Sequence, residues 1–306
     1  RMDWRPSGAL RVTPLDATGA VLQKAFFSTK SLPEDSLHDH LMGAYISGAD
    51  EIVIEFQTKE QKHVNGQIRR FLRCTRGFEI MEEHPSSVQL KCLMNVGDMP
   101  LHASLNRMYL QVTSLTRDIL SVFEGGPREY LSDAEERENE VDALLYLIER
   151  QMRILLDSHL VATRLNLTRT EAVEYSNLAR SLERMMDHAY TIASLILDHP
   201  KLTKNMIDMA PLEQLPVWQA SLKELMINIR TRDSTRIEHA RHELKSAQRR
   251  LMEHEQHVLR DHRLNEWMAF DLRLSESVRR LCAYARDFGE ILLNMKVFSE
   301  LHRKNL

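Results

Sequence analysis

The sequence predicts an α+β protein that is mainly α: a small α/β domain followed by two bundles of three long helices. Beyond residue 98, six segments repeat apolar residues every three or four positions, which is the period of a helix face. The 306 residues include only 10 Gly and 9 Pro, and aromatic residues make up 6%. So few chain breakers and aromatic side chains favour long helices over a sandwich or a barrel.

Residues 1–97 are expected to form the α/β domain, because helical and strand-like periods alternate there. The run Ile52-Val53-Ile54 is continuously apolar, which is typical of a buried strand. After short strands near 9–13 and 21–28, the expected order is helix, strand, helix, strand, strand, at Ser36–Ile46, Glu51–Phe56, Glu60–Arg73, Phe78–Glu82 and Val88–Leu93. This order predicts a small sheet covered by helices.

Residues 98–306 are expected to form the helical part of the chain. The two bundles are expected over 98–200 and 212–306, with helices at about 101–124, 129–160, 169–198, 216–231, 233–260 and 264–303. Thr168 and Glu171 have the spacing of a capping box, so they predict the start of the third helix. The short turn before Thr168 predicts that the second and third helices are antiparallel neighbours.

Composition excludes several classes of protein. The formal net charge of −3 does not mark the whole chain as a nucleic-acid binder. Cys74, Cys92 and Cys282 are too widely spaced for a zinc knuckle or a disulfide framework, so a reducing cytoplasm is expected. No stretch approaches the about 18 consecutive apolar residues of a spanning helix, and we expect no membrane insertion.

Two carboxylate pairs, Glu138 with Asp142 and Glu183 with Asp187, lie in the predicted second and third helices. Residues four apart share a helix face, with Cβ atoms about 5–6 Å apart, so each pair offers two neighbouring oxygen ligands. Across the seam of antiparallel helices, the two pairs can form one site of four carboxylates, which suits a hard cation. Acidic pairs are also common on solvated helix faces, and this alternative stays open.

The residues around these pairs bear on the identity of the metal. Carboxylate oxygens alone suit Mg, Ca, Mn or Fe, whereas His188 as a ligand would favour Zn or Ni. Asp118 is a candidate for a fifth carboxylate. A second candidate for Zn or Ni lies in the fifth helix, although a solvated polar face is the favoured interpretation of its residues, which are His239, His242, Glu253, His254 and His257.

Four stretches resemble one family. Ser-Leu-Glu-Arg-Met-Met-Asp-His-Ala at 181–189 resembles the helix signature of PhoU, a family of phosphate-uptake regulators, and Glu-Asn-Glu-Val-Asp-Ala-Leu at 138–144 resembles its partner motif one helix earlier. His-Leu-Met-Gly-Ala-Tyr-Ile-Ser-Gly-Ala-Asp-Glu-Ile at 40–52 and Gly-Phe-Glu-Ile-Met-Glu-Glu at 77–83 are similar to archaeal members. The resemblance is good over about residues 35–200 and looser over the remainder.

The resemblance implies two PhoU-like three-helix bundles and a metal site formed by Glu138, Asp142, Glu183, Asp187 and His188. It also implies a cytoplasmic regulator of phosphate uptake that acts by protein contact and not by catalysis. Its expected partners are the phosphate ABC transporter or an associated signalling protein, and a second copy of the chain in a homodimer.

The chain departs from the family pattern in two places. Many members carry a metal motif in both halves, but here Arg279 and Ala283 stand where the pattern places Glu183 and Asp187, so the second motif is expected to be lost. In archaeal members an AbrB-like DNA-binding hairpin often precedes this region, and residues 8–14 resemble its last strand. DNA is therefore an expected partner only if the full protein has that hairpin upstream.

Two other functions remain open. A carboxylate-bridged di-metal enzyme would use Glu-x-x-His pairs on bundle helices, but Glu60–His63 is the pair present and it lies outside the bundles. In a metal-free helical scaffold, the second alternative, the acidic pairs would bind no ligand. The basic residues Arg69, Arg70, Arg73 and Arg76 are expected to be a solvated face, with phosphate contact as the alternative.

Overall fold

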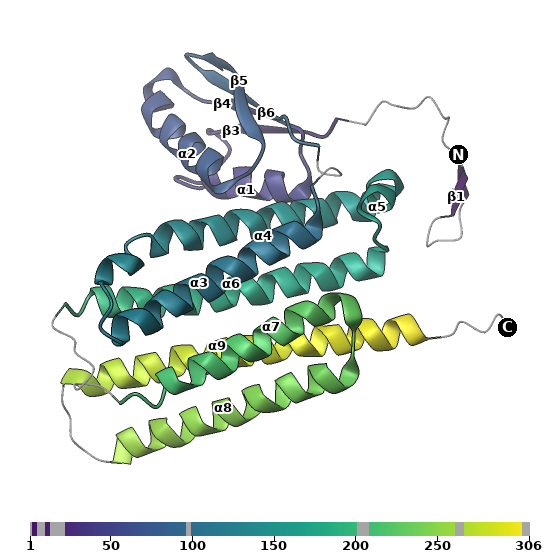
Figure 1. Cartoon of the computed structure of the whole chain (residues 1–306). Helices are drawn as coiled ribbons and strands as arrows, with labels where there is room; N and C mark the ends of the chain where they lie inside the picture. The colour runs from purple at the N-terminus through teal and green to yellow at the C-terminus, as the bar shows by residue number, and fades with distance from the viewer. Residues whose placement is uncertain are drawn as a thin grey trace. The chain divides into compact units, whose positions relative to one another are not determined.

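The computed structural model describes residues 2–4, 10–12, 22–95, 99–200, 208–260 and 266–301. Residues 96–98, most of residues 8–14, and residues 201–207 between the two expected bundles lie outside the described residues. The chain divides into two compact units, one of residues 1–100 with 146–172 and one of 101–145 with 173–306. Figure 1 shows the elements with the labels used below.

A four-stranded mixed sheet forms the α/β part of the first unit. In chain order, this α/β part consists of β3 (Lys24–Ser28), α1 (Leu37–Ser47), β4 (Glu51–Glu55), α2 (Gln61–Cys74), β5 (Phe78–His84) and β6 (Ser87–Cys92). The strand order is β3-β4-β6-β5, in which β3 runs parallel to β4 and the other neighbours are antiparallel. The expected order of helices and strands is therefore confirmed for this stretch. Two further strands, β1 (Met2–Trp4) and β2 (Leu10–Val12), pair with each other antiparallel.

The core of this unit lies between one face of the sheet and the helices α1 and α2. Alternate side chains of the central strands point to that face, among them Ile52, Ile54 and Leu90, which are fully buried. Gly48 ends α1 with a φ of +96°, and an added Cβ there would meet Ile154 at 2.9 Å, so only glycine fits this end of the helix.

The first helical bundle contains α3 (Leu101–Phe123), α4 (Ala134–Asp157) and α6 (Arg169–Leu197), with the short α5 (His159–Leu165) before α6. Figure 1 shows α3, α4 and α6 side by side. Arg107 of α3 pairs with Glu140 of α4 at 2.7 Å, and His102 of α3 shares a hydrogen bond with Tyr175 of α6 at 3.2 Å. These contacts place α3 against both α4 and α6.

The helix predicted at 129–160 is wrong at both ends. Residues Arg128–Leu131 form a 3-10 turn, and α4 begins only at Ala134. At the other end, Ser158 leaves the helical conformation, and its hydroxyl accepts a hydrogen bond from the Val161 amide, so α5 begins as a separate helix.

The second bundle contains α7 (Leu215–Thr231), α8 (Ser234–Arg260) and α9 (Glu266–Glu300). Trp218, Leu244 and Phe288, one from each helix, are fully buried in its core. Gln219 of α7 donates to the hydroxyl of Thr116 on α3 at 2.9 Å, which links the two bundles. Within the described ranges every strand lies before residue 95, so the mainly α fold with a small sheet is confirmed. None of the described helices is both long enough and apolar enough to span a bilayer.

Candidate metal centre

The two acidic pairs of the candidate metal site lie on α4 and α6, and buried apolar residues next to them pack these helices together. On α4, Val141 and Leu145 are buried beside the acidic pair, and on α6, Leu182 and Met186 are buried beside the other. The expected capping box before α6 is present: the Glu171 amide donates to the Thr168 hydroxyl, and the Thr168 amide donates to the Glu171 carboxylate, both at 3.1 Å. The capping box therefore fixes the residue at which α6 begins, and with it the helix face on which the acidic pair of α6 lies.

Three carboxylates meet across the seam between α4 and α6. Oxygen atoms of Glu138, Asp142 and Asp187 lie within 4.8 Å of one another. The first two side chains are half-buried and Asp187 is exposed, so a cation has access from solvent. Three oxygen ligands with open positions suit a hard cation that completes its shell with water.

The electrostatics join Glu183 to this group. Burial, followed by the neighbouring carboxylates Asp187 and Asp142, raises the pKa of Glu183 to about 7. Burial together with the charges of Asp142 and Asp187 likewise raises the pKa of Glu138 to about 7. Burial and Asp187 raise the pKa of Asp142 to about 6. Without a counter-ion the four groups resist full ionisation, and a bound cation would remove that penalty.

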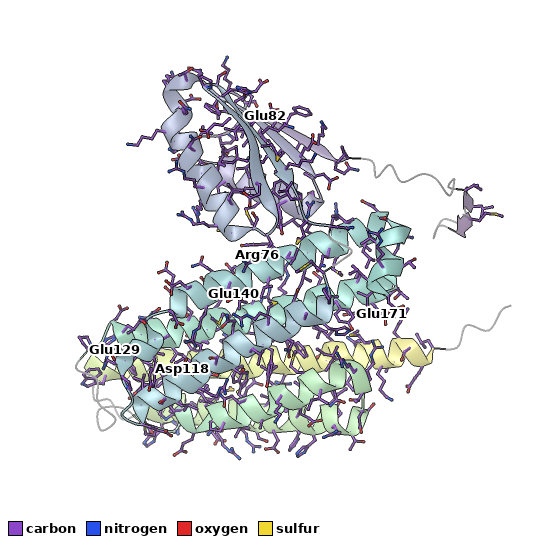
Figure 2. The ribbon with its side chains drawn as sticks, turned by 45° about the horizontal axis from the view of Figure 1, so that its top comes forward. Arg76, Glu82, Asp118, Glu129, Glu140 and Glu171 are labelled. Carbon is purple, nitrogen blue, oxygen red and sulfur yellow. The ribbon has the colours of Figure 1, made fainter. Side chains whose placement is uncertain are left out.

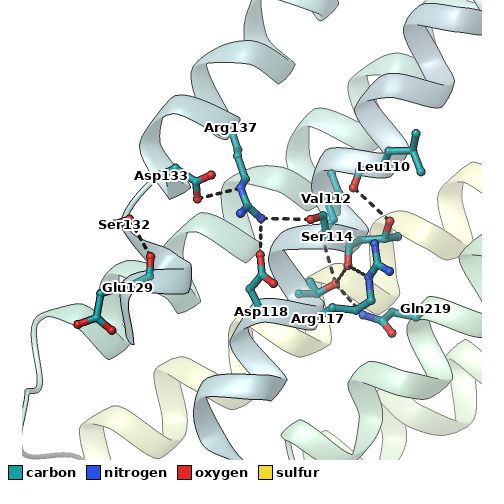
Figure 3. Close-up of polar contacts among 12 residues, drawn as sticks. Leu110, Val112, Ser114, Arg117, Asp118, Glu129, Ser132, Asp133, Arg137 and Gln219 are labelled. Carbon is teal, nitrogen blue, oxygen red and sulfur yellow. Dashed lines mark hydrogen bonds and ion pairs between the residues drawn. The ribbon is translucent and has the colours of Figure 1, made fainter. Parts of the chain in front are cut away.

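Other acidic residues of the same bundle are neutralised by arginines. Arg137 pairs with Asp118 at 2.6 Å and with Asp133 at 2.9 Å (Figure 3). Glu140, two residues after Glu138, is held by Arg107 and by the amide of Gln111. Within the described part of the chain, none of Glu138, Asp142, Glu183 and Asp187 has such a partner. The donor set therefore fits a cation.

Asp118, the candidate for a fifth carboxylate, lies outside this group. Its carboxylate is bound by the Arg137 guanidinium, so it is not available as a ligand. The ion pair of Arg137 was not predicted from the sequence, although a basic residue one position before Glu138, on the next face of the helix, is a signal for such a pair.

His188 lies at the edge of the seam and faces α9. Its ring stacks on Tyr284 with centroids 5.8 Å apart and an interplanar angle of 25°. Its Nδ1 is buried without a hydrogen-bond partner, and burial followed by the charge of Arg280 lowers the pKa of the imidazole. His188 is outside the three-carboxylate group, as is Glu183, and their roles as ligands stay predictions.

The second bundle has a different arrangement at the corresponding position. Arg279, which stands where the family pattern has an acidic residue, pairs with Glu255 of α8 at 3.0 Å. The acidic group on α4 and α6 is the single candidate metal cluster among the described residues. Of the histidines on α8, His239, His242 and His257 are exposed, whereas His254 is buried with its Nδ1 3.4 Å from Asp208.

Fold and site together define a class: mainly helical proteins with two three-helix bundles, a small α/β part and an acidic seam between two bundle helices. Residues 105–196 match the family model of the PhoU domain, and both acidic motifs fall within this match. The first bundle is thus similar to the PhoU domain, in agreement with the resemblance of its motifs.

Two further comparisons accompany this match. The crystal structure of PhoU from Pseudomonas aeruginosa aligns with a TM-score of 0.49 and 15% sequence identity, over 65% of this chain and 96% of that chain. The curated proteins gave no match.

Proposed function

We propose that this protein is a regulator of phosphate homeostasis that acts through protein contacts which depend on a bound metal ion. The PhoU domain at 105–196 supports the regulatory role, since PhoU is a family of phosphate-uptake regulators. The observation that carries the metal dependence is the group of unneutralised carboxylates on the seam between α4 and α6. The proposed partner is the phosphate ABC transporter or its signalling protein, contacted at the cytoplasmic face, and the proposed assembly is a homodimer.

The proposed ligands are Glu138, Asp142 and Asp187, with Glu183 completing the set. A cation held by them supplies positive charge to a site where burial and mutual repulsion oppose ionisation. The bound cation also links α4 to α6, which restricts the motion of the two helices relative to each other and makes the surface of the first bundle more rigid. Oxygen ligands favour Mg, Ca, Mn or Fe, and participation of His188 would favour Zn or Ni.

Thermal melting of the metal-loaded and metal-stripped chain tests the site. At a cation concentration of about 100 times Kd, linkage adds about 2.7 kcal/mol, which corresponds to a melting temperature higher by about 5 °C. The double variant Asp142→Asn with Asp187→Asn should lose this response. Glu136→Gln with Glu174→Gln, on the same two helices and with the same change in charge, should keep it.

If stripping the metal leaves the native melt unchanged, or if the control variant loses the response equally, the carboxylates are only a solvated face. Metal analysis of the reloaded native and variant chains provides a second reading, because it counts bound ions whatever the effect on stability.

The regulatory role is tested by affinity capture from phosphate-rich and phosphate-starved cells. We expect a component of phosphate transport or signalling to be recovered with the native chain, and in a smaller amount with the double variant. Capture of no such component in either condition would count against the proposal.

Among the residues that the structure describes, no feature favours the di-metal enzyme. Glu60 accepts hydrogen bonds from Thr29 and from the Gln57 amide, and His63 contacts Asp35 at 2.7 Å, so both groups serve local contacts of the α/β part.

A further inference from the structure

Helix α2 carries charge of one sign. Its 14 residues include Lys62, Arg69, Arg70 and Arg73 and no Asp or Glu. The whole chain has 41 basic and 44 acidic residues, and solvated helix faces normally mix both signs. With four basic residues and no acidic one, α2 therefore differs from the longer helices α3, α4, α6, α7, α8 and α9, which carry charges of both signs.

The basic side chains face away from the core. Val64, Ile68 and Phe71 form the buried side of α2, each with at most 1% of its surface exposed. Arg69 and Arg73 are four residues apart and share the opposite face with Lys62, and Arg70 lies next to them. All four basic side chains are exposed.

These cations are not neutralised by the protein itself. Several exposed arginines elsewhere have carboxylate partners, such as Arg236 with Glu224 at 2.8 Å. Across the described ranges, none of the four basic residues of α2 forms an ion pair. The arginines therefore hold positive potential that is free to act on an external anion.

One acidic residue of β5 is tied to the first half of α2. Glu83 accepts a hydrogen bond from Asn65 at 2.9 Å, one turn before Arg69, towards the start of α2. Figure 2 shows Glu82 and Arg76, the exposed arginine that follows α2, at opposite ends of the α/β part. The positive potential is thus concentrated in the second half of the helix.

We propose that the arginine stripe, defined as Arg69, Arg70 and Arg73, binds the phosphate backbone of duplex DNA without reading its sequence. The guanidinium fork matches phosphate oxygens, and a row of cations matches a row of regularly spaced phosphates. Single-stranded nucleic acid is disfavoured, because its sites use exposed aromatic side chains and Phe71 is fully buried.

A lipid surface fits the stripe less well than a duplex does. Helices that lie on membranes insert apolar side chains between lipid headgroups beside their basic residues. The large apolar side chains of α2 point into the core of the unit, and Asn65, Gly66 and Gln67 precede the arginines instead. The net charge of the chain, −3, also means that attraction to a polyanion must come from a local patch.

Fluorescence anisotropy of a short labelled DNA duplex of arbitrary sequence, titrated with the full chain, tests the proposal. We expect a Kd of about 10⁻⁶ to 10⁻⁴ M in physiological salt, and a steep loss of affinity as salt is raised. The triple variant Arg69→Gln, Arg70→Gln, Arg73→Gln should bind at least about tenfold more weakly. Its slope of log K against log salt should be shallower by about three, one for each phosphate contact removed.

Two variants control for folding and for net charge. The triple variant with lysine at the same three positions keeps the charges and should keep most of the affinity and the salt slope. The triple variant Lys223→Gln, Lys245→Gln, Arg249→Gln removes exposed cations from α7 and α8 and should bind as the native chain does.

Failure of the native chain to bind the duplex would overturn the proposal, as would an equal loss of affinity in the variant on α7 and α8. The same conclusion would follow if anionic phospholipid vesicles or inorganic polyphosphate bound the native chain under conditions in which the duplex did not.

Discussion

Glu138 and Glu140 are two residues apart on α4 but have opposite environments. Glu140 points towards α3, where Arg107 neutralises it, whereas Glu138 points into the seam with α6 and meets other carboxylates. Their spacing along the helix cannot distinguish the two, because both are acidic residues next to an apolar stripe. At this scale, the partner across the helix interface decides which carboxylate is structural and which is available to a ligand.

The sequence therefore predicted the faces of the acidic residues better than their partners. The i,i+4 spacing placed Glu138 with Asp142, and the short connection to α6 brought them near Asp187. The stacking of His188 on Tyr284 depends on a contact between helices about a hundred residues apart, which periodicity does not encode.

Asp271 of α9 predicts a dependence of stability on pH. Burial raises its pKa to about 6, although a hydrogen bond from the Asp208 backbone amide lowers it and the Asp208 carboxylate raises it by a smaller amount. The folded state therefore binds a proton more tightly than the unfolded state, so this contribution to stability is present at low pH and is lost as pH rises through about 6. We expect Asp271→Asn to flatten the change in unfolding free energy between pH 5 and pH 8, measured by urea denaturation.

The control for this prediction is Glu276→Gln, which removes an exposed carboxylate further along α9. It should leave the pH dependence as in the native chain. A native and an Asp271→Asn protein with the same pH dependence would show that Asp271 ionises normally in the fold.

Cys282 should be the least reactive thiol of the chain. It is fully buried, and burial raises the pKa of its thiol to about 12, so the thiolate needed for alkylation is rare. Cys74 and Cys92 are only partly buried. Mass spectrometry after brief iodoacetamide treatment should find labels at Cys74 and Cys92 in the native chain, and a label at Cys282 only in denaturant. Labelling of native Cys282 at the same rate as the other two would contradict this.

At the scale of the element, helix positions were predictable where local chemistry marks their ends. The expected helices at 36–46, 60–73 and 169–198 differ from α1, α2 and α6 by at most one residue at each end. The break at Ser158 was not predictable, because apolar residues continue at helical spacing through it. The strand order β3-β4-β6-β5 was not predictable from the sequence either, because strand pairing depends on contacts that the pattern of a single strand does not specify.

The capping box before α6 gives a prediction at this scale. Thr168→Ala removes the hydroxyl that accepts a hydrogen bond from the Glu171 amide. This substitution should lower the free energy of unfolding by about 1 kcal/mol. Thr170→Ala changes the same residue type two positions later, at an exposed site inside the helix, and should be neutral or slightly stabilising because alanine favours helix. Urea denaturation of both variants measures the difference. Equal effects would mean that the cap does not hold the start of α6.

At the scale of the whole molecule, the compact units do not follow the order of the chain. The expected domains, 1–97 and 98–306, divide the sequence at one point, but the first unit also includes 146–172. Helix α4 therefore begins in one unit and ends in the other. A signal in the sequence is that α4 has apolar residues on more than one face: Ala143 and Leu147 are buried in addition to Val141 and Leu145.

Arg150 joins the second half of α4 to the α/β core. It is fully buried, its guanidinium donates to the Tyr45 carbonyl at 2.8 Å, and it lies 3.5 Å from the Asp50 carboxylate. Its guanidinium carbon is also 5.2 Å from the centre of the Tyr45 ring and 5.6 Å from that of Phe78. The stability of the α/β core thus depends on a side chain about a hundred residues away in the sequence.

Arg150→Ala should leave the Tyr45 carbonyl unpaired and open a cavity beside two aromatic rings, so we expect the first unit to lose about 3 kcal/mol of stability. Hydrogen exchange of the full chain, followed by mass spectrometry, should then be about a hundredfold faster in α1, β4 and β6. Exchange in α7, α8 and α9 should stay unchanged, because those helices belong to the other unit. Arg153→Ala removes an exposed arginine less than one turn further along α4 and should change neither region. Equal acceleration across both units would show that they unfold as one, and an unchanged rate in α1 would show that Arg150 does not support the α/β core.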